Sequence, residues 1–270
     1  MARAVPAVTR ALDVLELFLD RNTLTAPEVA ERLKLPRTTV HELVNTLVDR
    51  SYLIASESSP IRYRLGMRLF QLGNRFAEQL DLAREAQQVA AEVAGACDET
   101  VHIAVLDGAH VVYVAKVDST HPVRMVSAVG RRLPAHCTAV GKVLLAALST
   151  EALEARYPPG QSLSAMTPNS VTSPARLRAV LSEVRAQGVS YDNCESNDAV
   201  RCVAAPVADH SGAVVAAISI SVPIIRWTPE REKEWTTLVR AGALSLSQRL
   251  GYSGSSDAIG LERLAVNSGG

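Results

Sequence analysis

The polar residues between Arg37 and Asn45 are of types whose side chains can bind nucleic acid. Arginine, threonine, histidine and asparagine donate hydrogen bonds to phosphate oxygens or base edges, and a glutamate can accept one from a cytosine amino group. Their spacing gathers them on one side of a helix. An ordinary amphipathic helix with a solvated face has the same pattern, so the neighbouring elements must decide. The residues are Arg37, Thr38, Thr39, His41, Glu42 and Asn45.

The elements around this polar face form a helix-turn-helix pattern. Thr25 and Glu28 have the spacing of a capping box, which predicts a helix over residues 26–33. Pro36 cannot continue that helix but suits the first turn of the next one, which is expected to end near Arg50. An apolar stripe on the second helix can pack against the first, and it consists of Val40, Leu43, Val44 and Leu47.

A third helix and a hairpin complete the N-terminal pattern. Apolar residues from Val8 to Leu19 recur at helical spacing and predict a helix that covers the other two. Residues 52–54 and 62–65 read as two short strands around a turn, which is the wing of a winged helix-turn-helix. Arg62 and Arg64 would lie on one side of this wing, either contacting flanking phosphates or remaining ordinary solvated charges.

The rest of the chain alternates helix-like and strand-like segments. An apolar stripe predicts a bridging helix over residues 67–80, and a further helix follows over 82–96. Antiparallel strands are predicted at 101–108, 110–117, 123–129, 189–192, 201–208 and 214–222. Helices are predicted at 138–148, 150–157, 173–187 and 229–250. Strand clusters separated by helices predict an α+β domain with one sheet covered by helices.

The composition excludes several classes of protein. With 47% hydrophobic residues in 270, the chain can build one large or two ordinary globular domains. No run approaches the roughly 18 apolar residues of a membrane span, and the first residues lack the apolar segment of a secretion signal. We therefore expect a cytoplasmic protein with no membrane partner. The net charge is +3 over residues 1–75 and −3 over the remainder. This distribution suits an N-terminal DNA-binding domain joined to a domain with another role.

Several strings resemble the IclR family of bacterial transcriptional regulators. They are TRALDVLELF, LPRTTVHELVNTL, YRLG, LPAHCTAVGKVLLA and RCVAAPVADHSGAVVAAISIS, and they span about residues 6–252. The resemblance implies a winged helix-turn-helix DNA-binding domain in residues 1–66, a linker helix in 67–81 and a GAF-like effector-binding domain in 82–252. It also implies a homodimer or homotetramer that pairs through its N-terminal half. Its implied partners are a double-stranded DNA operator and a small organic acid effector. The composition of residues 253–270, rich in Gly and Ser, predicts a disordered tail.

Two residues depart from the family pattern near the expected DNA contacts. Glu42 stands where an arginine is common, and Ser51 replaces the glycine usual before Tyr52. Phosphates would repel Glu42, so this side chain is expected to accept from a cytosine amino group or to pair with a neighbouring arginine. The operator sequence therefore does not carry over from the family.

The same resemblance implies an effector pocket in the C-terminal domain. Its apolar wall falls on Met125, Leu133, Ala139, Val140 and Val200, and its polar contacts fall on Asp192, Cys202, Ser219 and Ser221. Without the resemblance, Met125, Leu133 and Val200 read as ordinary core residues, and Asp192 reads equally well as a turn residue. Free amides at the start of the helix after Thr138 are a natural seat for a carboxylate. An apolar wall with few polar groups favours a small carboxylic acid, aromatic acids included, over a sugar phosphate or nucleotide.

Catalysis and metal binding are the competing functions. Cys137 beside His136, or Cys194 beside Glu195, would be the thiol site of a thiol-dependent enzyme, but adjacent residues on a strand point to opposite faces and no paired base follows from the spacing. His136, Cys194 and Cys202 are the candidates for a metal site. The cysteines show no C-x-x-C pairing, which favours free thiols. We therefore predict no catalytic residue, no metal site and no cofactor.

Overall fold

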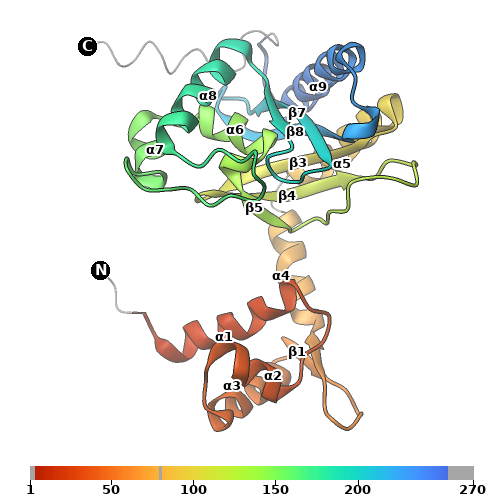
Figure 1. Ribbon diagram of the computed structural model, residues 1–270. Coiled ribbons are helices and arrows are strands. Elements are labelled where there is room, and N and C mark those ends of the chain that lie inside the picture. The colour runs from red at the N-terminus through yellow and green to blue at the C-terminus, as the bar shows by residue number, and fades with distance from the viewer. Residues whose placement is uncertain (1–3, 79–80, 255–270) are drawn as a thin grey trace. The chain divides into compact units, whose positions relative to one another are not determined.

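The computed structural model describes residues 4–78 and 81–254 of the chain. The chain divides into two compact units, Met1–Leu80 and Asp81–Gly270 (Figure 1). Within the described residues, no helix is both long and apolar enough to cross a membrane. The tail predicted for residues 253–270 lies outside the described residues from 255 onward.

The N-terminal unit combines three packed helices with a two-stranded wing and a fourth helix. Its elements are α1 (Pro6–Glu16), the 3-10 turn η1 (Leu17–Leu19), α2 (Ala26–Leu33), α3 (Arg37–Asp49), β1 (Leu53–Ala55), β2 (Tyr63–Leu65) and α4 (Met67–Glu78). The predicted capping box at the start of α2 is confirmed. The Thr25 hydroxyl accepts from the Glu28 N–H, and the Glu28 carboxylate accepts from the Thr25 N–H at 2.7 Å.

The first helix is shorter and more exposed than its apolar pattern predicts. The α-helical part ends at Glu16, and a 3-10 turn completes it. Val14 is buried in a core shared with α2 and α3, whereas Val8, Leu12 and Leu19 are 57%, 53% and 73% exposed. The prediction that this apolar run covers the bundle is therefore wrong for these three residues, because Val8 and Leu12 line an open groove beside α3 and Leu19 lies at the exposed end of η1.

A close approach between Ser51 and Gly66 closes the wing. β1 and β2 pair antiparallel, with Leu53 opposite Leu65. Ser51 has a φ of 62°, in the left-handed region that favours glycine. A Cβ atom on Gly66 would lie 2.2 Å from the Ser51 carbonyl oxygen, so Gly66 is needed for the two segments to meet. Ser51 thus carries its side chain at a strained backbone position.

The C-terminal unit is built on one antiparallel sheet of order β5-β4-β3-β8-β7-β6. Its elements are α5 (Asp81–Cys97), β3 (Thr100–Asp107), β4 (His110–Val117), β5 (Arg132–Pro134), η2 (Ala135–Cys137), α6 (Ala139–Ala146), α7 (Thr150–Arg156), α8 (Pro174–Gln187), β6 (Ser190–Asn193), β7 (Val200–Ala208), β8 (Val214–Pro223), η3 (Ile224–Arg226) and α9 (Pro229–Arg249). The predicted α+β class is confirmed.

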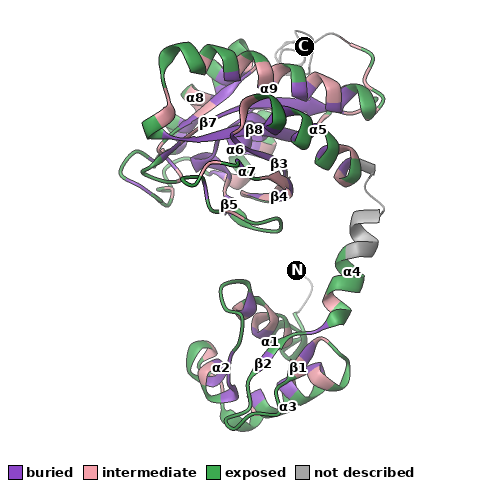
Figure 2. Cartoon of the chain, turned by 90° about the vertical axis from the view of Figure 1, so that its right-hand side faces the viewer, coloured by how far each residue is buried: buried purple, intermediate pink, exposed green. Residues whose placement is uncertain are grey.

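Helices cover both faces of this sheet, and the buried strands lie between them in Figure 2. α5 and α9 pack together on one face, where a Cβ atom on Gly242 of α9 would lie 2.6 Å from the Val93 side chain and 3.3 Å from that of Ile218. α6 lies on the opposite face, where residues such as Ala204 and Ala217 join its core cluster. Because alternate residues of a strand point to opposite faces, the side chains beneath α6 form a set of their own.

The segment 123–129, predicted as a strand, is irregular, so this prediction is wrong. β4 pairs instead with residues 132–134. A side-chain donor takes one of the carbonyl groups that a ladder would use, since Lys116 Nζ donates to the Ser127 carbonyl at 2.6 Å. Met125 is buried, while the residues on both sides of it are exposed. The segment therefore contributes the buried side chain of Met125 to the core and adds no strand to the sheet.

The predicted bridging helix is observed as α4, described as far as Glu78. Of the apolar stripe predicted along it, Leu69 is half-buried and Leu72 is exposed. The side chains of Phe76 and Leu80 lie outside the described residues, so the stripe as a whole stays a prediction.

Candidate functional site

The polar face of α3 is exposed, whereas its opposite side enters the core of the N-terminal unit. Pro36 at the helix start offers no side chain to the first-turn amides, and these orphan N–H groups add donors to the same end of the face. Thr39 differs from its neighbours because it is half-buried and lines a groove against α1. The exposed residues are Arg37, Thr38, His41, Glu42 and Asn45.

The two arginines predicted for the wing are both exposed. Arg64 lies in β2, and Arg62 lies just before that strand, where its guanidinium donates to the Thr23 hydroxyl at 3.3 Å. Neither forms an ion pair with another described residue. Both charges are therefore available to an anion.

A groove of about 610 Å³ runs between α1 and α3. Its lining is mostly apolar and includes Val8 and Leu12 of α1 and Leu43 of α3, with Glu42 at the α3 side. More than half of the Val8 and Leu12 side chains is exposed. A contiguous apolar surface of this kind is typical of a protein interaction site.

The four predicted polar effector contacts lie on one face of the sheet. Asp192, Cys202 and Ser221 lie directly opposite one another on the neighbouring strands β6, β7 and β8. Ser219 is two residues from Ser221 and so points to the same face. All four are buried, and Cys202 Sγ lies 3.2 Å from Ser221 Oγ. The structure thus gathers residues that are far apart in the sequence onto the sheet surface under α6.

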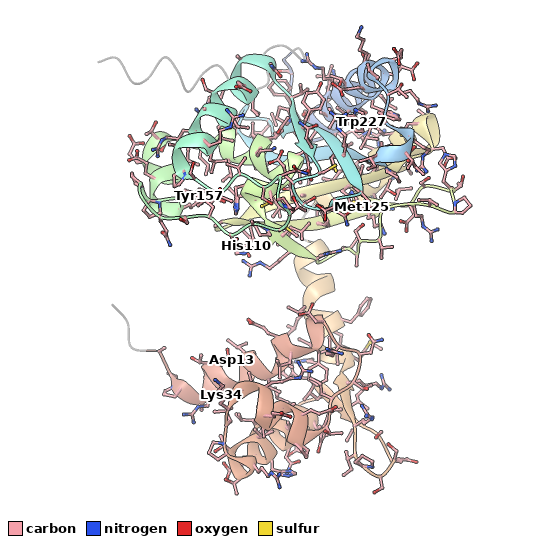
Figure 3. All side chains as sticks on the ribbon, in the orientation of Figure 1. Asp13, Lys34, His110, Met125, Tyr157 and Trp227 are labelled. Atoms are coloured by element: carbon pink, nitrogen blue, oxygen red, sulfur yellow. The ribbon has the colours of Figure 1, made fainter. Side chains whose placement is uncertain are left out.

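The predicted apolar wall belongs to the same region. Its members join one buried cluster that also contains Cys202. The side chain of Met125, labelled in Figure 3, enters this cluster from the irregular segment before β5. The five residues are Met125, Leu133, Ala139, Val140 and Val200.

His102, which the sequence reasoning missed, is hydrogen-bonded into this face. It lies on β3 opposite Ser219, fully buried. Its Nδ1 lies 3.2 Å from Ser221 Oγ and its Nε2 lies 2.6 Å from Ser127 Oγ, while the ring stacks on Tyr113 at a centroid distance of 4.4 Å. Burial lowers the pKa of His102 to about 3, so the ring is neutral near pH 7. The available signal was a single histidine inside an otherwise apolar strand pattern.

The start of α6 is held against η2 by Gly141. A Cβ atom on Gly141 would lie 2.1 Å from the Ala135 carbonyl oxygen. The Thr138 hydroxyl caps the helix by accepting from the Gly141 N–H at 3.0 Å. Among the hydrogen bonds of the described residues, none uses the N–H groups of Ala139 and Val140. These two donors are therefore free to bind a ligand.

Asp192 is bound by its own loop. One carboxylate oxygen accepts from the Glu195 N–H at 2.6 Å, and the other accepts from the Ser196 hydroxyl at 2.5 Å. Asp192 itself lies in strand β6, and its carboxylate binds the turn that follows the strand, while a contact with an effector stays a prediction. Burial raises the pKa of Asp192 to about 6, because an apolar environment disfavours the charged carboxylate.

The thiols show no arrangement suited to covalent chemistry. Burial raises the pKa of all four cysteines, which disfavours the reactive thiolate. His136 Nε2 lies 2.9 Å from the Ser164 carbonyl oxygen, so this nitrogen is occupied. Across the described parts of the chain, no three His, Cys, Asp or Glu side chains are placed to hold a metal ion, and the trio of His136, Cys194 and Cys202 is no exception.

Two family models together match most of the chain. Residues 7–54 match the IclR helix-turn-helix domain, and residues 74–248 match the family described as bacterial transcriptional regulator IclR C-terminal. The HTH-type transcriptional regulator KdgR of Escherichia coli (strain K12) is 33% identical over 249 residues, which cover 92% of this chain and 94% of that protein.

Solved structures match along nearly their whole length. The IclR protein of Thermotoga maritima has a TM-score of 0.72 at 26% identity, covering 92% of this chain and 99% of its own. An IclR homolog from Microbacterium hydrocarbonoxydans, complexed with 4-hydroxybenzoate, has a TM-score of 0.79 at 27% identity and covers 90% of this chain and 98% of its own. The chain belongs to the IclR family and is a DNA-binding transcriptional regulator with an effector-binding C-terminal domain.

Proposed function

We propose that this regulator changes its affinity for a DNA operator when a small carboxylic acid binds between the sheet and α6. The observation that carries the proposal is the polar row across three neighbouring strands, in which Cys202, Ser221 and His102 are joined through the Ser221 hydroxyl. This row lies in the same part of the fold as the apolar cluster and the open first turn of α6. Apolar walls with a few convergent polar groups are the usual form of a small-molecule site.

Each part of such an acid has a counterpart in this region. The carboxylate would accept from the free N–H groups of Ala139 and Val140, at the positive end of α6. The body of the acid would pack against Met125 and Leu133. A hydroxyl at its far end would bind beside His102, at the Ser221 and Ser127 hydroxyls that the two ring nitrogens already contact. The relative from Microbacterium hydrocarbonoxydans supports an aromatic hydroxy acid, because its 4-hydroxybenzoate carries both polar groups.

The remaining predicted residues keep supporting roles in this proposal. Val140 and Val200 complete the apolar wall, and Ser219 adds a hydroxyl beside Ser221. Asp192 acts mainly by holding the loop that begins at its own strand, since both of its oxygens already accept from that loop. We propose no catalytic step and no bound cofactor or metal.

On the DNA side, α3 would enter the major groove. Its exposed face supplies base-reading donors, and the wing arginines Arg62 and Arg64 would contact flanking phosphates. Glu42 would accept from a cytosine amino group at the edge of that face. The half-buried Thr39 would contribute its first-turn N–H rather than its side chain. The proposed set is Arg37, Thr38, Thr39, His41, Glu42, Asn45, Arg62 and Arg64.

A second copy of the chain is the proposed occupant of the groove between α1 and α3. The exposed Val8 and Leu12 would pack against the same residues of the partner, in an isologous contact. The two N-terminal units of such a dimer would read a pseudo-palindromic operator. Two of these dimers would form a tetramer, and the protein would act in the cytoplasm. An effector that binds one arrangement of the two N-terminal units more tightly must change the affinity for the operator. The change equals the coupling free energy between effector binding and operator binding, commonly about 1–3 kcal/mol.

The test is an operator-binding measurement at fixed salt, with DNA from immediately upstream of the protein's own gene. We expect sequence-specific retention that 4-hydroxybenzoate or another small carboxylic acid changes by roughly 5- to 150-fold, the range of that coupling. Arg37→Ala should weaken retention, whereas Arg84→Ala, an exposed arginine on α5, should not. Retention no tighter than that of random DNA, or retention insensitive to every acid tried, would contradict the proposal.

A further inference from the structure

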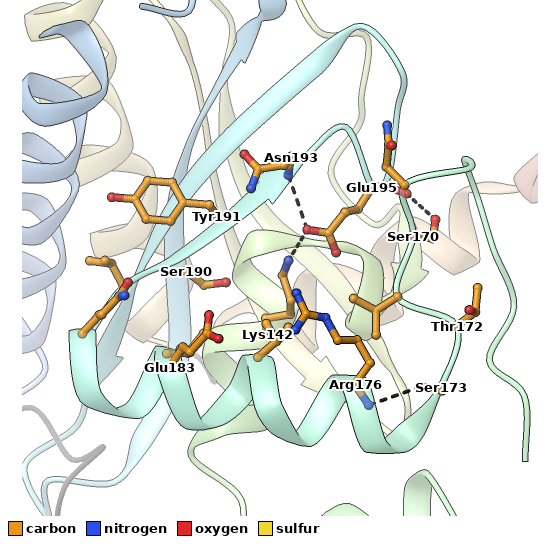
Figure 4. A pocket seen from close by; sticks show the side chains of 16 residues that line it. Lys142, Ser170, Thr172, Ser173, Arg176, Glu183, Ser190, Tyr191, Asn193 and Glu195 are labelled. Carbon is orange, nitrogen blue, oxygen red and sulfur yellow. Dashed lines mark hydrogen bonds and ion pairs between the residues drawn. The ribbon is translucent and has the colours of Figure 1, made fainter. Parts of the chain in front are cut away.

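A separate cavity of about 620 Å³ lies between α8, β6 and the loop that precedes α8 (Figure 4). Its lining contains none of the nine residues assigned above to the effector pocket. Most of its lining side chains are polar, with Val180 and Val184 of α8 forming an apolar patch. The cavity is therefore a candidate for a second ligand, distinct from the effector.

The floor of the cavity holds two buried polar atoms without a partner. Lys142 of α6 and Glu195 form a buried ion pair through Glu195 Oε1. Glu195 Oε2 and Ser190 Oγ find no hydrogen-bond partner in the described chain. Glu195 and Ser190 are 6% and 1% exposed, and Figure 4 shows both side chains pointing into the cavity. A buried polar atom left unpaired is destabilising, so both atoms favour a bound group that donates hydrogen bonds.

The mouth of the cavity carries one charge of each sign. Arg176 and Glu183 are seven residues apart on α8, so they lie on the same side of that helix. Both are exposed, and no ion pair among the described residues uses either of them. With the Lys142–Glu195 pair below, the cavity holds two cationic and two anionic side chains. Its charge balance matches a ligand that is itself a zwitterion.

We propose that this cavity binds a free α-amino acid. The ammonium group has three N–H donors, which would bind Glu195 Oε2, Ser190 Oγ and the Glu183 carboxylate. The carboxylate would accept a charge-assisted pair of hydrogen bonds from the Arg176 guanidinium. Val180 and Val184 would contact the side chain of the amino acid.

Other small ligands satisfy only part of this arrangement. A carboxylic acid without an amine leaves Glu195 Oε2 without a donor, and an amine alone leaves Arg176 without an anion. An ordered water molecule would donate hydrogen bonds to Glu195 Oε2 and Ser190 Oγ, but its binding would not depend on Arg176. The effect of replacing Arg176 therefore separates an amino acid from a trapped water or a simple amine.

The cavity is connected to the proposed effector pocket through two residues of its floor. The Glu195 N–H donates to Asp192, and Lys142 belongs to α6, whose first turn would hold the effector carboxylate. An amino acid on the floor would therefore alter effector affinity. This coupling rests on the proposed function, whereas binding of the amino acid does not.

The test is calorimetric titration of the full-length protein, without DNA or effector, with each common proteinogenic amino acid in turn. We expect at least one to bind, and Arg176→Gln to weaken that binding by at least about tenfold. Ser190→Ala should weaken it as well without lowering the melting temperature, because the lost hydroxyl has no partner in the described chain. The matched control is Arg178→Gln, two residues along α8 and paired with Glu154, which should leave binding unchanged.

Two outcomes would overturn the proposal. One is that the unmodified protein binds no amino acid. The other is that Arg176→Gln and Ser190→Ala bind as tightly as the unmodified protein. Repeating the titration with His102→Phe separates the two sites, since amino-acid binding should survive a change that weakens the effector response. Loss of operator binding in any of these proteins would count against the proposed function alone.

Discussion

His102 Nδ1 lies 3.2 Å from Ser221 Oγ, although the two residues are 119 positions apart in the chain. They meet because β3 and β8 are antiparallel neighbours in the sheet. The contact places a neutral imidazole among hydroxyl groups in the proposed effector pocket. The contact joins β3, near the start of the domain, to β8, near its end. A substitution of His102 can therefore test whether this contact contributes to effector binding.

Replacing His102 with phenylalanine should weaken the effector response and leave effector-free operator binding intact. Phenylalanine can still stack on Tyr113 but removes both ring nitrogens, leaving Ser221 and Ser127 without that partner. A lost hydrogen bond in a buried site corresponds to roughly a tenfold shift in effector dose. Operator retention at increasing effector concentrations measures it. His210→Phe, on the exposed β7–β8 turn, should keep the normal dose, and an equal shift in both variants would contradict the prediction.

The stability of the C-terminal unit should depend on pH through Asp192. Its pKa is raised to about 6 in the folded protein by burial, against about 3.9 in an unfolded chain. Between these values the folded state binds the proton more tightly, so this group's contribution to the free energy of unfolding falls as pH rises from about 4 to 6. Asp192→Asn should remove that slope, which urea unfolding across a pH series would detect.

Asp209 provides a control of opposite sign. Hydrogen bonding from the Ser211 side chain lowers the pKa of Asp209, so its contribution to stability is present above the unfolded pKa and is lost as pH falls. Asp209→Asn should therefore lessen the loss of stability in acid. If Asp192→Asn and the unmodified protein differed by a constant amount at every pH, the assignment to Asp192 would be wrong.

Replacing Gly141 with alanine should destabilise the domain by about 3 kcal/mol. The new Cβ atom would lie 2.1 Å from the Ala135 carbonyl oxygen, a backbone atom that cannot rotate away. η2 and α6 would have to separate. Gly95→Ala in α5 is the matched control, since no atom lies within 4 Å of its added Cβ and alanine favours helix by about 1 kcal/mol. Denaturant unfolding should show opposite signs, and a harmless Gly141→Ala would refute the close approach.

Replacing Ser51 with glycine should stabilise the N-terminal unit by about 1 kcal/mol. Ser51 has a φ of 62°, and residues with a Cβ atom lose roughly 1–2 kcal/mol in the left-handed region. Glu31→Gly, at an exposed position of α2, should instead lower the free energy of unfolding by about 0.5 kcal/mol because glycine is a poor helix former. The melting temperature of the N-terminal transition reports both changes. A drop in both would mean that the Ser51 side chain contributes more than its backbone strain costs.

Replacing Leu12 with glutamate should break the proposed pairing of the N-terminal units. The carboxylate would be buried in the apolar groove between α1 and α3 and in its partner. We expect the dimer dissociation constant to rise by at least roughly tenfold, as for an anchor residue of an interface. Leu19→Glu changes an exposed leucine outside that groove and should leave assembly unchanged. Sedimentation velocity distinguishes the cases, and unaltered assembly of the Leu12 variant would exclude this groove as the interface.

The sequence predicted the features whose determinants are close together along the chain. The capping box needs only Thr25 and Glu28, and α2 was placed with its observed bounds. The buried side of α3 follows from one helical period, and every hairpin-connected strand pair follows from alternation and a turn. Such features depend on interactions within a few residues, so a pattern is sufficient to find them.

The sequence could not show what depends on long-range packing. Whether Val8 and Leu12 are buried depends on which other segments pack against α1. Helical periodicity identifies the apolar side of a helix but does not show whether another segment covers it. The irregular 123–129 segment depends on donors such as Lys116 that pattern reading ignores. His102 becomes recognisable as a site residue only when the register places β8 beside it. The effector residues came from the family resemblance, and their binding roles stay predictions.

The residues proposed as the wall of the effector pocket are also members of the main packed cluster of the C-terminal unit. Evolving a preference for a different acid would require changes at positions such as Met125, Leu133 or Val200. Each such change also alters packing, so new specificity and lost stability come from the same substitutions. Lineages that switch effectors should therefore acquire compensating mutations on the opposite face of the sheet, under α5 and α9, where stability can be recovered without touching the ligand.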